Sequence, residues 1–517
     1  MGKTFRQSMA WLHAWSGLVV GWILFAVFVT GTASYYRAEI SQWMRPELRY
    51  GRSFGPDEMA ATAERGVAYL REHAGGARTW FITLPRPEMP LLELFWRTGP
   101  GRPPGHVLLD PDSGAPAEVR ETRGGDFLYR FHFELSLPPL WGRWIVGLCA
   151  MIMLVALVSG IVTHRRLFVD FFTFRRRADQ RGWLDAHNVT GVLALPFHVM
   201  ITYTGLVTLA SLYMPWGVKT AYRGDAQRYY VESGQITVPR PPAGTAGTLA
   251  PVGPMVVQAL SRIPQPLERL TIVNPRDAHS VVVAVFEEPH GLSHQHPQVA
   301  FHGSSGEIAE IRAGDLRPAT RTFTTMVGLH EAHFAGSALR VLFFLSGLLG
   351  CAMVATGLVL WSVARLPKGR APSRMPLSHR LVHTLNVGTV AGLPFAVACY
   401  FLANRLLPVA MPGRAEAEIQ AFFGGWVVVA LLGLGLAPRR AWIVALATVA
   451  IAYLLVPLVG GLREGGTVSV AFDVIVLGIG AGFGFAAYAL ASRPSKQKTS
   501  RQICIPDSTV APNLEIS

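Results

Sequence analysis

The sequence is poor in cysteine and in charged residues. Only four of its 517 residues are cysteine; Cys149, Cys351 and Cys399 lie inside apolar runs, Cys504 lies near the C-terminus, and no CxxC or CxxCH motif occurs. A disulfide scaffold, an iron–sulfur cluster and covalently attached c-type haem therefore lack support. Charged residues make up 15% of the chain and hydrophobic residues 50%. This balance argues against an ordinary soluble globular protein and favours a membrane protein.

Motifs for nucleotide binding and for serine hydrolysis are also missing. No GxGxxG follows a strand-like run, and neither GxxxxGK[ST] nor GxSxG occurs in a suitable context. Flavin or nicotinamide binding in a Rossmann unit, nucleotide hydrolysis and serine hydrolysis therefore lack support.

Eight apolar stretches are long enough to cross a membrane as helices. A transmembrane helix needs about 20 predominantly apolar residues. The stretches lie at roughly 10–35, 142–163, 187–213, 338–363, 382–404, 421–437, 441–459 and 467–491. The first follows Lys3 and Arg6, as in a signal peptide, but its apolar run is too long for a cleaved leader, so we expect a retained helix.

Basic residues gather on one side of this predicted membrane region. If the eight helices alternate in direction, the basic N-terminus, the arginine-rich loops at 165–181 and 365–374, Arg439 with Arg440, and the tail from Arg493 fall on the same side. Basic loops stay in the cytoplasm, so we expect a bacterial inner-membrane protein with both termini cytoplasmic. The net charge of +14 then reflects topology in a lipid bilayer, and no nucleic-acid partner is expected.

Two long segments lie between predicted helices on the opposite, periplasmic side. Each combines a helical opening with strand-like runs, which is typical of a small α+β domain. The predicted fold class is a multi-pass α-helical membrane protein of about eight helices with two small α+β periplasmic domains. The predicted boundaries are helices at 1–36, 139–164, 187–213 and 335–363, periplasmic domains at 37–138 and 214–334, basic cytoplasmic loops at 165–186 and 364–381, a C-terminal four-helix region at 382–491 and a cytoplasmic tail at 492–517.

The first two thirds of the chain form an internal repeat. HVLLDPDSGAPAEVR (106–120) aligns with QVAFHGSSGEIAEIR (298–312) at a constant offset of 192 residues. In the membrane region the aligned pairs are His13 with His187, Gly17 with Gly191, Gly31 with Gly205, His132 with His330, and Gly160 with Gly357. The repeated unit is helix, domain, helix, so the four helices from 382 onward are an appendage.

Histidines recur at matched depths of this repeat. Ionisable residues inside a membrane are costly and are usually functional, and neutral imidazole is a standard axial ligand of non-covalent haem. If the halves are related by a two-fold axis along the membrane normal, His13 and His187 would hold one haem near the cytoplasmic face. His132 and His330 would hold a second near the periplasmic face, and such a bundle would carry electrons across the bilayer.

His198 is a further candidate with an open role. It follows His187 by eleven residues, so in one continuous helix the two would share a face at a separation of roughly 16 Å. The repeat places Leu24 opposite His198, which leaves His198 as a ligand, a hydrogen-bond partner or a relay. Further candidates are His333, which could exchange roles with His330, and His164 and His383 at predicted helix ends.

A histidine-rich loop lies outside the predicted membrane region. It contains His290, His294, His296 and His302. Either a metal or ferric-ligand site or a solvated loop fits this composition. Because the loop has no cysteine and contains glycine, serine and proline, we favour the solvated loop.

The ordered motifs resemble a known family. They are WLHAWSGLVVGWILFAVFVTGT, FHFELSLPPLWGRWIVGLCAMIMLVALVSG, DAHNVTGVLALPFHVMITYTGL and LHEAHFAGSALRVLFFLSGLLGCAMVATGLVLW. Over about residues 1–370 the chain resembles the PepSY-associated transmembrane helix family, whose members include iron-regulated inner-membrane ferrisiderophore reductases. The resemblance implies two periplasmic PepSY-like domains and a four-helix core in which His13, His132, His187 and His330, and less firmly His198, hold two b-type haems. The helices at 382–491 depart from the family pattern.

These observations lead us to expect an oxidoreductase. A cytoplasmic or quinol donor would reduce the haem near His13 and His187, and the electron would pass to the haem near His132 and His330. Ferric siderophore in the periplasm would then be reduced from Fe(III) to Fe(II), which weakens its binding by hard oxygen ligands. The alternatives are a PepSY-type periplasmic binding or regulatory module without redox activity, and a haem or siderophore transporter.

Overall fold

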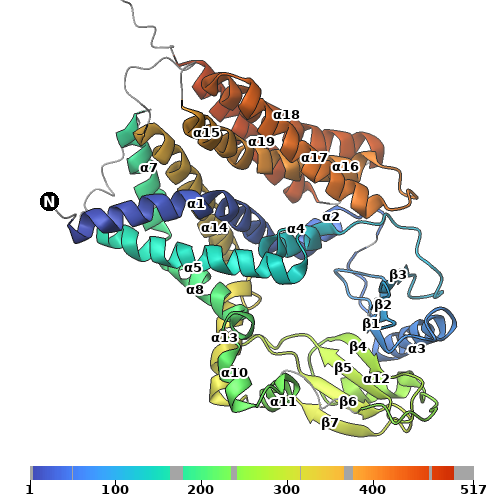
Figure 1. The fold of residues 1–517 in the computed structure, drawn as a ribbon. Coiled ribbons are helices and arrows are strands. Elements are labelled where there is room, and N and C mark those ends of the chain that lie inside the picture. Colours follow the sequence, from blue (N-terminus) through green and yellow to red (C-terminus); the bar gives the residue numbers. More distant parts are fainter. Residues whose placement is uncertain are drawn as a thin grey trace, which may run out of the picture.

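The computed structural model describes residues 4–48, 50–99, 101–163, 179–234, 241–314, 316–365, 376–464 and 469–493. Its membrane region consists of long apolar helices (Figure 1). They are α1 (Phe5–Ser34), α5 (Pro139–Thr163), α7 (Gln180–Leu193), α8 (Leu195–Thr208), α14 (Ser337–Ala364), α15 (Leu377–Val390), α16 (Gly392–Leu406), α17 (Arg414–Gly435), α18 (Pro438–Glu464) and α19 (Val470–Ala491).

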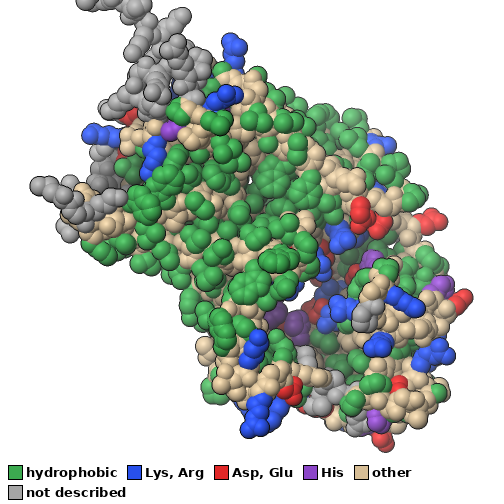
Figure 2. Space-filling view, in the orientation of Figure 1, with side chains coloured by type: hydrophobic (Ala, Val, Ile, Leu, Met, Phe, Trp, Pro, Cys, Tyr) green, Lys and Arg blue, Asp and Glu red, His purple; other side chains and the backbone are tan. Residues whose placement is uncertain are grey.

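The number of candidate membrane spans agrees with the number predicted from the sequence. Within the described ranges, seven helical spans are long and apolar enough to cross a bilayer, with α15 and α16 counted together, and the bent pair α7 and α8 makes an eighth. Helices satisfy their own backbone hydrogen bonds, which a lipid environment demands. Apolar side chains cover the outside of this bundle (Figure 2). The expectation of a multi-pass helical membrane protein is therefore confirmed.

The third span is broken. Helices α7 and α8 meet at an angle of 67°, and Ala194 between them has φ −111° and ψ 21°. Pro196 in the first turn of α8 has no N–H to continue the hydrogen-bond ladder of α7. The expectation that His187 and His198 share one face of a continuous helix is therefore wrong.

The first helix is the centre of the membrane region. It packs against α5 and α14, and small residues let the backbones come close. A Cβ atom on Gly21 would lie 2.7 Å from Leu358 of α14, and one on Gly347 of α14 would lie 2.3 Å from Thr32 of α1. Close approach at small residues is the usual way in which membrane helices pack.

Outside the membrane, the two long segments share one antiparallel sheet. Its strands are β1 (Thr79–Thr83), β2 (Leu92–Arg97), β3 (Gly105–Leu109), β4 (Leu267–Val273), β5 (Val281–Phe286), β6 (Gln298–His302) and β7 (Ile308–Arg312). Their order is β3-β2-β1-β4-β5-β6-β7. The first strand of each repeat pairs with the other, with Trp80 opposite Ile272. Where the sequence predicted two separate units, the structure therefore joins them edge to edge.

Two helices cover one face of this sheet. Trp80, Ile82, Leu94 and Ile272 turn inward from the strands and pack into a buried core beneath α3 (Pro56–His73) and α12 (Val252–Leu260). Alternation along each strand sends the next side chains to the opposite face. That second face, including Phe95, looks towards the membrane helices.

Short helices connect this domain to the membrane region. Helix α4 (Gly124–Glu134) precedes α5, and α13 (Pro318–Glu331) precedes α14. Each ends at a residue in the left-handed region, Leu135 with φ 54° and Ala332 with φ 58°, so the repeat extends to these turns. The remaining short helices are α2 (Arg37–Trp43), α9 (Ala210–Tyr213), α10 (Trp216–Ala221) and α11 (Ala226–Glu232).

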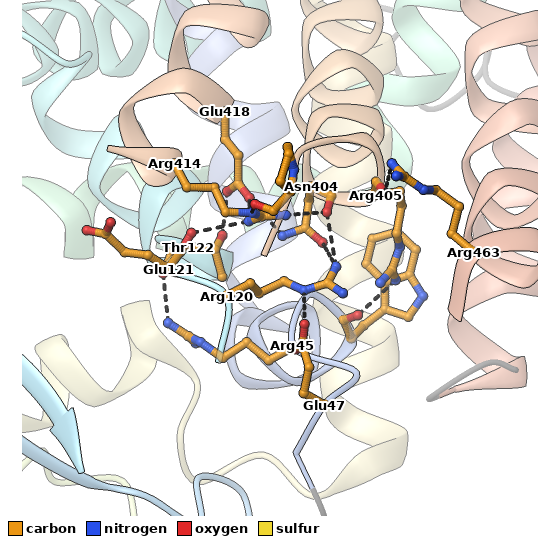
Figure 3. A network of polar contacts seen from close by, with 12 residues as sticks. Arg45, Glu47, Arg120, Glu121, Thr122, Asn404, Arg405, Arg414, Glu418 and Arg463 are labelled. Carbon is orange, nitrogen blue, oxygen red and sulfur yellow. Dashed lines mark hydrogen bonds and ion pairs between the residues drawn. The ribbon is translucent and has the colours of Figure 1, made fainter. Parts of the chain in front are cut away.

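The C-terminal helices are fixed to the rest of the chain by a buried polar network (Figure 3). Arg414 and Glu418 of α17 form an ion pair in which both side chains are fully buried. Thr122 donates a hydrogen bond to Glu418, and the Arg120 guanidinium donates to the backbone carbonyl of Asn404, at 3.0 Å. The segment before α4 is thus tied to α16 and α17.

Candidate functional site

The first pair of histidines lies between the N-terminal end of α1 and α7. The ring centres of His13 and His187 are 6.1 Å apart, with the planes tilted by 59°. His13 of α1 faces α5, and His187 of α7 faces α14. The two repeats thus contribute equivalent side chains to one location.

The second pair lies at the end of the membrane region nearer the sheet. The ring centres of His132 and His330 are 6.0 Å apart, with the planes tilted by 31°. His132 comes from α4 and lies against α1, and His330 comes from α13 and lies against α8. These histidines stand on the short connecting helices and not on membrane spans.

All four imidazoles are oriented in the same way. In each ring Nδ1 lies within hydrogen-bond distance of a backbone carbonyl, at 2.8 Å for Ala156 with His13, 2.9 Å for Met353 with His187, 2.8 Å for Val27 with His132 and 3.1 Å for Ile201 with His330. A carbonyl can only accept, so Nδ1 carries the proton and Nε2 carries the lone pair. This second hydrogen bond is typical of histidines that ligate a metal.

A glycine makes room for each of the four rings. A Cβ atom on the glycine would lie 3.1 Å from Cε1 of His13 at Gly160, 3.0 Å from that of His187 at Gly357, 2.7 Å from that of His132 at Gly31 and 2.8 Å from that of His330 at Gly205. These are two pairs of repeat-related glycines. They explain why glycine stands in the aligned motifs of both halves.

The spacing within each pair fits a metal ion between two imidazoles. The ring centres are 6.1 Å apart in the first pair and 6.0 Å apart in the second. Two metal–nitrogen bonds of about 2 Å each account for about 4 Å of this distance. The distance from each ring centre to its own nitrogen accounts for the rest. The pairs also lie at different depths. His13 and Val27, which contacts His132, are fourteen residues apart on α1, or about 21 Å along the helix axis.

His198 is fully buried but faces no second histidine within hydrogen-bond or ligand-pair distance among the described residues. Its ring packs edge-on against Phe28, with ring centres 6.0 Å apart, and against Phe197. It lies one helical turn before Ile201, which contacts His330. The geometry therefore places His198 beside the second pair and gives it no ligand partner there.

The other candidates belong to neither pair. His383 packs edge-on against Trp442. His333 faces the extramembrane domain, where it contacts Glu288 and Glu331. His164 lies outside the described residues.

A large cavity joins the second pair to the extramembrane sheet. It has a volume of about 1480 Å³ and is lined by His132 and His330 at one end and by Glu93, Phe95 and Arg97 of the sheet at the other. Figure 2 shows the hollow between the membrane helices and the sheet, with histidine and basic side chains along its edge. Seven arginines and nine carboxylates stand among its described lining residues. It therefore offers donors and acceptors to a polar ligand.

The family of the chain follows from its repeated membrane region. The family model described as "PepSY-associated TM region" matches residues 10–364, which contain all four paired histidines and their glycines. The chain belongs to this family. An uncharacterized protein of Pseudomonas aeruginosa is 27% identical over 318 residues, covering 58% of this PepSY-associated protein and 78% of the relative. The C-terminal spans from α15 onward lie outside the matched region.

Sequence reasoning missed the groups that orient the histidines. Backbone carbonyls have no sequence signal of their own. Thr204, whose hydroxyl lies 3.2 Å from Nδ1 of His330, stands directly before Gly205, and the TG dipeptides could have pointed to it. The contact of His333 with Glu288 was missed because Glu288 comes from a distant loop.

Proposed function

We propose that this protein is an inner-membrane di-haem b electron-transfer protein. It would reduce a ferric siderophore from Fe(III) to Fe(II) on the periplasmic side and so release the iron, with a cytoplasmic or quinol donor of unknown identity. The observation that carries the proposal is that two pairs of histidines lie at two different depths. In each of the four rings, Nδ1 lies within hydrogen-bond distance of a backbone carbonyl and a glycine lies against the ring edge. Bound haem would supply one-electron carriers near both membrane faces.

The protein's own residues have three tasks in this proposal. His13 with His187, and His132 with His330, would supply nitrogen ligands to the haem irons, and the carbonyls fix the tautomer and the ring direction. Apolar helices surround the His13–His187 pair and keep water from it. The cavity beside His132 and His330 receives the ferric chelate, so that its iron approaches the periplasmic pair without entering the bilayer.

The cavity supports this reading over a binding module without redox activity. Its volume of about 1480 Å³ exceeds the roughly 300–1,000 Å³ of ordinary small-molecule pockets. A module that only holds a partner protein would not need a cavity that reaches two facing imidazoles. A chelate reductase needs that connection, because the electron must reach the chelated iron.

The test is a spectrum and an assay on the full chain purified in detergent. We expect a dithionite-reduced minus oxidised spectrum of low-spin b-type haem, with two haems per chain by pyridine haemochrome quantification. Chemically reduced protein should then convert a ferric siderophore to Fe(II), trapped by a ferrous-specific dye. Well-folded protein without haem would refute the proposal.

The glycines give a prediction that is specific to ring position. We expect Gly31→Ala to disturb only the periplasmic haem, because the new Cβ would lie 2.7 Å from both Cε1 and Nδ1 of His132 and the ring would have to move. Redox titration should show a shifted potential or lower occupancy for one haem and an unchanged second haem. Gly17→Ala on the same helix is the control, because nothing lies within 4 Å of its Cβ position. Identical titrations for the two variants would contradict this role.

A further inference from the structure

The loop between β5 and β6 brings histidines from two parts of the sequence around one carboxylate. Glu288 and His294 belong to this loop, and His333 follows α13. One potential ligand atom from each of the three lies within 4.8 Å of the other two. The sequence left a solvated loop and a metal site as alternatives, and this convergence supports the metal site.

We propose that Glu288, His294 and His333 form a binding site for a divalent transition-metal ion at the edge of the cavity. Two imidazoles and one carboxylate are a set that binds zinc and, with open positions for water or another ligand, ferrous iron. The site is separate from the two histidine pairs. It requires no haem.

The contacts around Glu288 show how the ligands converge. Its Oε1 atom contacts Nδ1 of His294, lies 3.3 Å from Nδ1 of His333 and lies 3.3 Å from Nε2 of His296. A metal ion would take the place of the protons that now lie between this carboxylate and the imidazoles.

Neighbouring groups support the three proposed ligands. Glu331 Oε2 lies 3.5 Å from Nε2 of His333. His296 Nδ1 lies 2.9 Å from the carbonyl of Phe286 and 3.4 Å from Glu268, so its other nitrogen is directed at Glu288. Partners of this kind orient ligands and raise metal affinity.

The loop is held firmly on α13. The His294 backbone N–H donates to the carbonyl of Thr324 at 3.0 Å, and the hydroxyls of Ser293 and Thr324 are 2.6 Å apart. A Cβ on Gly328 would lie 1.9 Å from the carbonyl oxygen of Leu292, so only glycine permits this contact. The ligands are therefore positioned before a metal arrives.

The location suggests a use for the ion. Glu288, His333 and His330 all line the same cavity. On the proposed function, Fe(II) released from a chelate in the cavity would meet this site on leaving, and this step alone rests on that function. The metal site itself stands whether or not the protein reduces iron.

The test uses zinc, which has no redox chemistry of its own. The full chain, purified in detergent with a histidine-free tag and stripped with chelator, is titrated with zinc chloride by calorimetry and checked by elemental analysis. We expect one tight zinc ion per chain. His294→Ala and the near-isosteric Glu288→Gln should each weaken binding by at least tenfold, and His296→Ala by about tenfold.

Two controls separate this site from other sources of binding. His290→Ala removes an exposed histidine from the same loop that is not in the group and should bind zinc as the wild type does. His13→Ala, which removes a proposed haem ligand, should also keep full zinc affinity, so failure of the haem proposal would not mimic failure here. Wild-type zinc binding no tighter than that of the His294→Ala, His333→Ala double variant, with unchanged circular dichroism, would overturn the site.

Discussion

Replacing His330 by alanine should remove one of two haems and leave the other spectroscopically intact. His330 Nδ1 is held by the carbonyl of Ile201, so its Nε2 is the nitrogen directed at His132, 6.0 Å away between ring centres. Without that ligand, the haem proposed at this pair would be lost or would change from low to high spin. Pyridine haemochrome content and the reduced spectrum of detergent-purified protein measure both outcomes.

The same measurements on further variants test which histidines hold which haem and whether electrons pass through both. His132→Ala should affect the same haem as His330→Ala, and His13→Ala should affect the other one. Each should lower the rate of ferric-chelate reduction to background, because the path needs both carriers. His73→Ala, at an exposed histidine of α3 that does not line the cavity, is the matched control. Retention of two low-spin haems in folded His330→Ala protein would contradict the assignment of His330 as a haem ligand.

Of the substitutions considered for the C-terminal helices, Glu418→Ala should cause the largest loss of folding stability. Arg414 and Glu418 are both fully buried, and Asn404 Nδ2 donates to Glu418 at 2.8 Å. Glu418→Ala would leave the Arg414 guanidinium buried without its counter-ion. Breaking one side of such a pair costs about 3–5 kcal/mol. Thermal unfolding in detergent, followed by tryptophan fluorescence, should show a midpoint several degrees lower.

The same helix provides the control. Glu416 pairs with Arg123 at 3.5 Å, but both side chains are about half exposed, so Glu416→Ala should change stability by no more than about 1 kcal/mol. The double variant Arg414→Met, Glu418→Leu should be more stable than Glu418→Ala, because no unpaired charge remains. Equal unfolding midpoints for Glu416→Ala and Glu418→Ala would show that the network does not anchor the C-terminal helices.

Much of the membrane architecture could be predicted from sequence because it depends on local composition and on the repeat. Apolar run length marks the spans, and equivalent positions in two copies mark His13 with His187 and His132 with His330. The glycines at 31 and 205 repeat for the same physical reason, since each lies against an imidazole edge. A repeat exposes such pairings without any knowledge of distances.

Other features depend on contacts that no local pattern records. The break before α8 had a signal in Pro196, but a proline alone does not tell a kinked helix from a 67° bend. The pairing of β1 with β4 joins residues almost two hundred positions apart. The cluster around Glu288 forms only because the loop between β5 and β6 lies against the residues that follow α13. How the C-terminal helices are fixed to the rest of the chain becomes clear only from the contacts of Arg120 and Thr122 with α16 and α17.

The shared sheet also limits how the molecule can move. Secondary transporters built from repeats commonly rock one repeat against the other. Here the β1–β4 ladder runs across the boundary between repeats, from Thr79 opposite Val273 to Thr83 opposite Arg269, and sits in the middle of seven strands. Rocking the halves apart would pull this ladder open and expose Trp80 and Ile272. The shared ladder therefore holds the two repeats in a fixed relative position, which is what the proposed electron transfer would need and what a rocking transporter would not allow.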